Sequence, residues 1–201
     1  MASDAYSQLR AHARSLALTT IFDKPHERDI ICDLLQLGLE LEKIKEIASE
    51  PMLAMIRMQW WYDLFEAGTL PHEAPDFAKR LYDNNAITKA DLLHIVQTSR
   101  DSLQTPIPEV SWETLFIVIA KSNDWQISVT CLRQMGRNFA ALYQDDERQQ
   151  YHALSDRDIK QASGGNYGFM RLMNLLISRQ ITQRSDSDPL LIFRFLFRLL
   201  F

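Results

Sequence analysis

Glycine, cysteine and basic charge are all scarce in this chain. Six glycines in 201 residues leave room for few tight turns, which favours long helices over short strands joined by hairpins. The net formal charge of −4 provides no basic stripe of the kind that nucleic-acid binding needs, so we expect no nucleic-acid partner. The two cysteines, Cys32 and Cys131, lie far apart inside apolar-periodic segments, which favours free buried thiols over a disulfide.

Long hydrophobic runs and a targeting pattern at the N-terminus are also lacking. No apolar run reaches the roughly 18 residues that a membrane-spanning helix requires. The first residues include Asp4 and few basic groups, unlike a secretory or mitochondrial leader. We therefore expect a cytoplasmic location, with peripheral attachment to the inner membrane as the open alternative.

Apolar periodicity of the helical kind runs through most of the chain. The spacing predicts helices over residues 4–22, 25–47, 51–68, 75–82, 88–103, 111–120, 125–143, 155–163 and 167–181. No alternating strand pattern competes with it, and a hydrophobic share of 46% is enough for one well-buried core. The sequence therefore predicts an all-α helical bundle that forms a single domain over residues 1–201.

The helix expected over residues 25–47 carries a heptad-like apolar seam. Its members are Ile30, Leu34, Leu37, Leu41, Ile44 and Ala48, and Ile31, Leu35 and Leu39 widen it. A stripe this wide predicts burial on more than one side of the helix. Gly38 costs roughly 1 kcal/mol of helix propensity relative to alanine, and a close approach by another helix would explain its presence.

The segment from Glu50 to Trp61 reads Glu-Pro-Met-Leu-Ala-Met-Ile-Arg-Met-Gln-Trp-Trp. Ser49 suits the N-cap of a helix over this segment, and Pro51 suits its first turn. Two adjacent tryptophans on one helix cannot face the same way, so we expect one in the core and the other at a surface or cavity. The segment resembles a hallmark of the squalene/phytoene synthase family, in which many bacterial members read Ser-Glu-Pro-Met-Leu-x-x-Ile-Arg-Leu-Gln-Trp-Trp.

The resemblance is clear over about residues 10–66 and weaker but compatible over residues 111–201. It implies a helical bundle of the isoprenoid-synthase type, shortened in this chain, with a central cavity for long prenyl chains. It further implies that four residues of the hallmark segment line that cavity or bind substrate: Arg57, Gln59, Trp60 and Trp61.

The chemistry of that family needs Mg²⁺, which carboxylates of two aspartate-rich motifs hold against a diphosphate. At the place of the first motif, Lys45, Glu46 and Ser49 stand where aspartates are expected. A shifted frame puts Glu42, Glu46 and Glu50 at i, i+4 and i+8, where their oxygens would face one ion. The other interpretation is a solvated helix face with local ion pairs.

The second motif is expected in a later helix, with Gly136 as the glycine that precedes it. Asp145 and Asp146 lie in a polar run at the end of that helix, a position more typical of a cap or loop than of a ligand set. The five histidines show no metal-ligand spacing. These departures argue against prenyl transfer.

The last thirteen residues, Pro189 to Phe201, are apolar apart from two arginines. Arg194 and Arg198 are four residues apart and therefore share one helix face. Such a helix can lie on a membrane, with Phe193 and Phe197 inserted and the arginines at lipid phosphates. The alternative, which we favour, is that this helix completes the core or contacts a protein partner, with the arginines extending to solvent.

Two functional hypotheses follow from the resemblance. The first is a pseudoenzyme, similar to the degenerate branch that includes the phytoene-synthase-like assembly factor of respiratory complex I. It would need no cofactor and would bind a lipid or isoprenoid ligand, or a protein partner, at a membrane. The alternative is an active transferase that condenses two prenyl diphosphates with Mg²⁺ held by Glu42, Glu46 and Glu50.

Overall fold

The computed structural model describes residues 4–48, 50–104, 109–140 and 171–177. Every secondary-structure element in these ranges is a helix, which confirms the all-α bundle. The helices are α1 (Asp4–His12), α2 (Arg14–Leu18), α3 (Pro25–Ile47), α4 (Pro51–Glu66), α5 (Asp76–Asp83), α6 (Lys89–Asp101), α7 (Glu109–Ser122) and α8 (Val129–Ala140). Residues 171–177 are helical as well. No helix of this described part combines the length and the apolar character needed to cross a bilayer.

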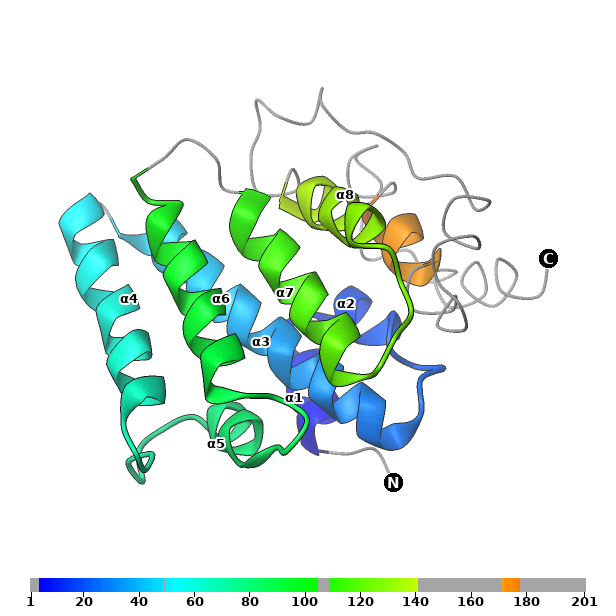
Figure 1. Cartoon of the computed structure of the whole chain (residues 1–201), viewed down its shortest axis with the longest axis horizontal. Helices are drawn as coiled ribbons and strands as arrows, with labels where there is room; N and C mark the ends of the chain where they lie inside the picture. The colour runs from blue at the N-terminus through cyan, green and yellow to red at the C-terminus, as the bar shows by residue number, and fades with distance from the viewer. Residues whose placement is uncertain (1–3, 49, 105–108, 141–170, 178–201) are drawn as a thin grey trace.

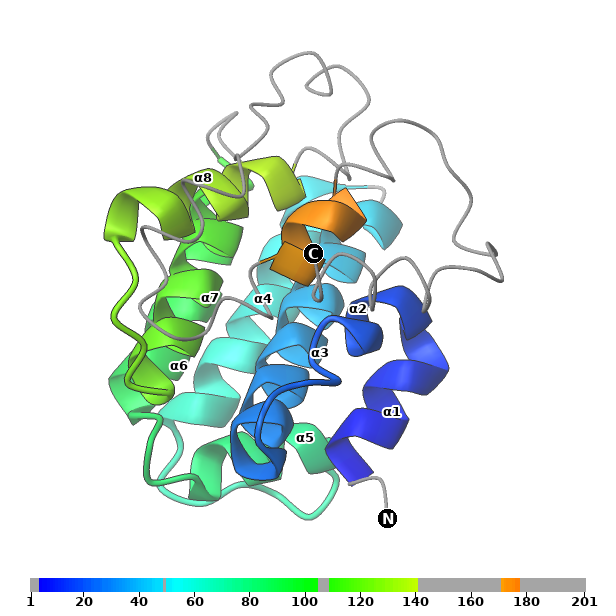
Figure 2. The ribbon, with the colours of Figure 1, turned by 90° about the vertical axis from the view of Figure 1, so that its right-hand side faces the viewer.

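Helix α3 is the central element of the bundle. In Figure 1, α4, α6 and α7 form a row in front of it, and α8 packs against α7. Figure 2 shows α1 and α2 on the opposite side of α3. Helix α5 closes one end, where Arg80 donates two hydrogen bonds to the buried carboxylate of Asp33, at 2.7 and 2.9 Å. One hydrophobic cluster includes side chains from α1 through residues 171–177.

The predicted seam of α3 is confirmed over most of its length. Residues 30–38 are buried without interruption, and Leu41 is buried one turn further on. Ile44 and Ala48 are only partly buried, because the helix leaves the core at its C-terminal end. A Cβ on Gly38 would lie 2.7 Å from the ring of Trp112 of α7. The glycine therefore permits the close helix approach that the sequence predicted.

The helix predicted over residues 4–22 is two helices. Ala13 has φ −144° and ψ 76°, outside the helical region, and separates α1 from α2. After α2, the hydroxyls of Thr19 and Thr20 donate to the carbonyls of Leu16 and Ala17, at 2.7 and 2.9 Å. These bonds satisfy carbonyls that would otherwise lack a partner at the end of α2. The helix can therefore end here even though the apolar pattern of the sequence continues.

Three further helix starts differ from the expectations in detail. Helix α4 has Glu50 as its N-cap residue and Pro51 at its first position, while Ser49 lies outside the described residues. Helix α7 begins at Glu109, so Ser111 is a buried position within the helix and not its cap. Helix α8 begins at Val129, after a link in which Asp124 adopts φ 53°. The expected start at Trp125 is wrong, because this residue lies in the non-helical link before α8, although its side chain is buried.

Other local predictions are confirmed. Thr88 and Asp91 form a reciprocal capping box at the start of α6. Cys32 and Cys131 are both buried and are not joined in a disulfide. Burial raises the pKa of the Cys32 thiol to about 12, although a hydrogen bond with Thr20 acts to lower it. This thiol therefore stays protonated at neutral pH.

Candidate functional site

The C-terminal half of α3 meets the start of α7 through one buried carboxylate, that of Glu42. Its Oε2 accepts a hydrogen bond from Nε1 of Trp112 at 3.1 Å, and Nζ of Lys45 donates to the same oxygen at 3.1 Å. Lys45 also donates to Oγ of Ser111 at 3.4 Å. Glu42 and Lys45 are three residues apart on α3, so helix geometry brings their side chains to the same face.

The interpretation of this stretch as a solvated helix face is correct for one part and wrong for another. Glu46 and Glu50 are exposed, as a solvated face requires. Glu42 is 8% exposed, and the side chain of Lys45 is only 13% exposed. The Glu42–Lys45 pair is therefore a part-buried internal contact that joins two helices.

The three glutamates do not fit a Mg²⁺ site in this arrangement. A divalent cation at Glu42 would approach the ammonium group of Lys45, which already occupies Oε2, and like charges at that distance repel strongly. Glu50 precedes α4 and is separated from Glu46 by the end of α3. Among the described residues, no group of three or more histidine, cysteine, aspartate or glutamate side chains is placed to hold a metal ion.

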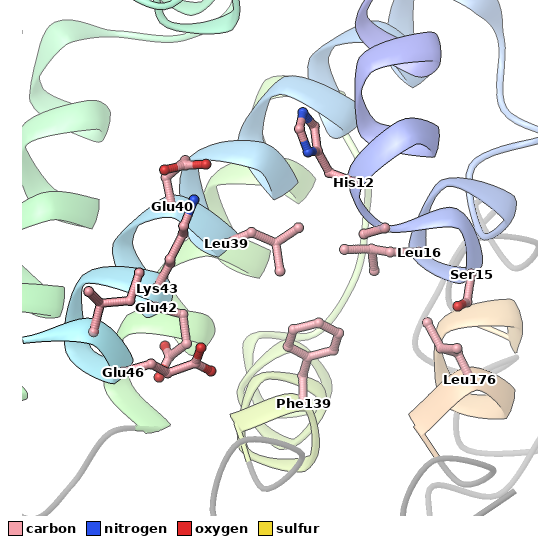
Figure 3. A pocket seen from close by; sticks show the side chains of 12 residues that line it. His12, Ser15, Leu16, Leu39, Glu40, Glu42, Lys43, Glu46, Phe139 and Leu176 are labelled. Atoms are coloured by element: carbon pink, nitrogen blue, oxygen red, sulfur yellow. The ribbon is translucent and has the colours of Figure 1, made fainter. Parts of the chain in front are cut away.

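A cavity of about 560 Å³ opens beside this carboxylate cluster. Figure 3 shows Glu40, Glu42, Lys43 and Glu46 of α3 on one side of it. The facing side combines apolar and polar groups, and the cavity lining there includes His12, Ser15, Leu16, Phe139 and Leu176. The cavity therefore has a charged wall on α3 and a largely apolar wall opposite, which suits an amphiphilic ligand.

The four residues of the hallmark segment do not converge on this cavity, whose lining contains none of them. Trp61 is 5% exposed and packs between Phe65 of α4 and Phe77 of α5, with ring centroids 5.8 Å away in each case. Trp60 stacks edge-on against Trp61 and is 50% exposed. One tryptophan in the core and one at a surface is the arrangement that the sequence predicted.

Gln59 and Arg57 also have clear places on α4. Gln59 links α4 to α6, because it accepts a hydrogen bond from Arg100 at 2.6 Å and donates to Asp63 at 2.7 Å. Arg57 is exposed on the outer side of the helix. Gln59 and Trp61 thus hold the helices together, whereas Arg57 and Trp60 are available to a binding partner.

Several residues of the site escaped sequence reasoning. Trp112 and Ser111 belong to a helix whose apolar pattern predicts burial, but no local signal connects them with a carboxylate some seventy residues earlier. Gly38 is the best indication in the sequence, because a glycine within this helix predicts the close approach of another helix. The side chain that approaches it is the ring of Trp112. Asp145 and Asp146 of the second motif, and Phe193, Arg194, Phe197 and Arg198, lie outside the described residues.

A second group of charged side chains lies at the other end of α3. Oδ2 of Asp23 and Oδ1 of Asp29 are buried without a hydrogen-bond partner among the described atoms. Burial and the neighbouring Glu27 raise the pKa of Asp23 to about 7, although Arg28 acts in the opposite direction. Asp23 therefore titrates near neutral pH.

No family model, curated protein or solved structure matches the chain. The geometry of the chain itself and the resemblance of the segment from Glu50 to Trp61 are therefore the indications of its function.

Proposed function

We propose that this chain is a non-catalytic, squalene/phytoene synthase-like protein that acts as a lipid-binding or membrane-associated assembly protein. One observation carries the non-catalytic part of the proposal. The carboxylate of Glu42 is bonded to both Lys45 and Trp112, so the best-placed acidic side chain of α3 serves the packing of the bundle. An ammonium group at this position opposes the divalent cation that prenyl transfer requires.

The ligand-binding part of the proposal is supported by the cavity beside α3. Its volume of about 560 Å³ and its division into a charged wall and a largely apolar wall suit a lipid-like or isoprenoid molecule. An assembly role would use the same bundle to bring a protein partner to a membrane. This part of the proposal requires binding only, and no reaction.

The direct test is incubation of the protein with farnesyl or geranylgeranyl diphosphate and Mg²⁺, with diphosphate release as the readout. We expect no release above the level of a protein-free control. Release that disappears in Glu46→Ala but persists in Glu73→Ala would overturn the proposal in favour of an active transferase. Glu73 is the matched control, because it is an exposed glutamate in the link between α4 and α5.

A further inference from the structure

Helix α4 has apolar side chains on two opposite sides, and the described residues pack against only one of them. Ala54, Met58, Trp61 and Phe65 face the core. On the other side, Met52 is 72% exposed, Ile56 60% and Trp60 50%. Leu53 and Ile47, the last residue of α3, are exposed nearby. We call these five residues, Ile47, Met52, Leu53, Ile56 and Trp60, the outer face of α4.

The spacing along the helix makes the outer face continuous. Met52, Ile56 and Trp60 recur every four residues, so they form one ridge, and Leu53 lies beside it. Scattered exposed apolar residues are ordinary, but a contiguous patch of large ones marks a contact site. Helix α4 is the outermost helix of the row in Figure 1, so the ridge lies on a convex edge of the bundle. A convex edge suits a flat or yielding surface better than it suits an isolated peptide, which needs a groove.

The composition of the outer face matches a lipid interface. Trp60 combines a large apolar ring with an N–H group that favours the boundary between hydrocarbon and water. Arg57 is exposed next to the ridge, and its long side chain can extend its guanidinium to lipid phosphates. Leu, Ile and Met beside one arginine and one tryptophan form the apolar side of an interfacial helix.

The surrounding charge decides which lipid surface fits. Glu46 and Glu50 lie at the α3–α4 corner, and Asp63 and Glu66 are exposed further along α4. These four carboxylates slightly outnumber the exposed basic side chains nearby, Lys43, Arg57 and Lys89, so an anionic bilayer would gain no attraction from this side of the molecule. Zwitterionic headgroups present an ammonium group outermost, which complements the carboxylates, and a phosphate beneath it for Arg57.

We propose that the outer face of α4 binds a bilayer surface of zwitterionic lipid, with Ile56 and Trp60 inserted among the headgroups. The inference rests on the membrane-associated part of the proposed function and names the surface that makes the contact. It assigns the contact to the corner between α3 and α4, where Ile47 also lines the edge of the cavity beside Glu42.

The experiment uses the full chain and vesicles of phosphatidylcholine with phosphatidylethanolamine, with co-sedimentation as the readout. We expect Ile56→Asp to reduce the vesicle-bound fraction by roughly tenfold, because it places a charge in the middle of the inserted ridge. Val129→Asp is the matched control. Val129 is 48% exposed at the start of α8, so the variant adds the same charge elsewhere, and we expect binding to change by less than about twofold.

Two further measurements sharpen the assignment. Trp60 is the one strongly exposed tryptophan of the four, so vesicles should shift the emission of the wild-type protein to shorter wavelength and leave that of Trp60→Phe unshifted. Replacing a third of the lipid with phosphatidylglycerol should not strengthen binding, because this side of the molecule offers an anionic surface no net attraction.

Several results would overturn the inference. Failure of the wild-type protein to bind these vesicles, or equally good binding by Ile56→Asp, would contradict the proposed contact. Protection of Trp60 from aqueous quenchers in the absence of lipid would show that another part of this chain covers the outer face of α4. Self-association that Ile56→Asp abolishes would instead assign the face to a second copy. Loss of binding in Phe193→Asp with full binding in Ile56→Asp would assign the contact to the end of the chain. None of these results affects the non-catalytic proposal, which only diphosphate release can remove.

Discussion

The indole nitrogen of Trp112 donates to Oε2 of Glu42 over 3.1 Å and so ties α7 to the C-terminal half of α3. Trp112 is 2% exposed, and its ring also packs against Phe139 of α8 with centroids 4.4 Å apart. This side chain therefore joins three helices, and with Lys45 it satisfies the only buried carboxylate in the described C-terminal half of α3.

Replacement of the Trp112 indole should lower the stability of the fold. We expect Trp112→Phe to lower the free energy of unfolding by about 2–4 kcal/mol, because it removes a hydrogen bond to a charged group and leaves a cavity. Urea denaturation measures the change. Glu42→Gln keeps an acceptor for the indole and should lose less than Trp112→Phe does. A loss below about 1 kcal/mol in Trp112→Phe would show that the contact contributes little.

Gly38 provides a second test of the same helix contact. Alanine has the higher helix propensity, by roughly 1 kcal/mol, so Gly38→Ala would stabilise an isolated helix. In the bundle its Cβ would lie 2.7 Å from the ring of Trp112, so we expect a net loss of about 1–3 kcal/mol from overpacking. Thermal or urea unfolding would measure it.

Gly68→Ala is the control for this substitution, because no atom lies within 4 Å of a Cβ added there. We expect Gly68→Ala to change stability by less than about 0.5 kcal/mol. Equal stability of Gly38→Ala and the wild-type protein would mean that α3 and α7 separate more readily than their packing implies.

The helix bounds and the core of the central helix were predictable from the sequence, whereas the face of α4 was not. Helix α3 runs from Pro25 to Ile47 as predicted, because proline marks its start and a single apolar seam runs along it. In α4 the apolar residues Met52 to Trp61 surround most of the helix, so periodicity alone cannot say which of them are buried. Contacts with α3, α5 and α6 decide which residues are buried, because these helices cover one side of α4.

The candidate site was predictable in one part. Lys45 stands among the expected ligands in the sequence, and its positive charge already opposes a metal site there. The bond between Glu42 and Trp112 joins residues from two helices that meet only in the folded bundle, so no local pattern reveals it. The break at Ala13 was equally hidden, because the apolar residues on either side of it keep the spacing of a continuous helix.

Asp23 makes stability depend on pH. Burial and Glu27 raise its pKa from 3.8 to about 7, so the folded state holds the proton more tightly than the unfolded chain does. The stabilising contribution of the protonated carboxyl is complete below about pH 4 and is lost as the pH rises through about 7. We expect Asp23→Asn to gain stability over the wild-type protein as the pH rises from 5 to 8, by as much as about 2–3 kcal/mol.

Urea unfolding of both proteins at pH 5 and pH 8 measures this difference. Asp124→Asn makes the same change in net charge at an exposed residue and should show a difference of less than about 0.5 kcal/mol between the two pH values. A stability gain in Asp23→Asn that is equal at pH 5 and pH 8 would contradict the assigned titration.

The uninterrupted burial of residues 30–38 in α3 has a consequence for how the molecule opens. Helices α1, α4, α5, α6 and α7 all contact α3, and each contributes part of the shell around it. The segment from residue 30 to residue 38 therefore cannot unwind while these neighbours stay in place. The middle of this helix belongs to the most cooperative unit of the protein, and its backbone amides are expected to exchange with solvent only when the whole bundle unfolds.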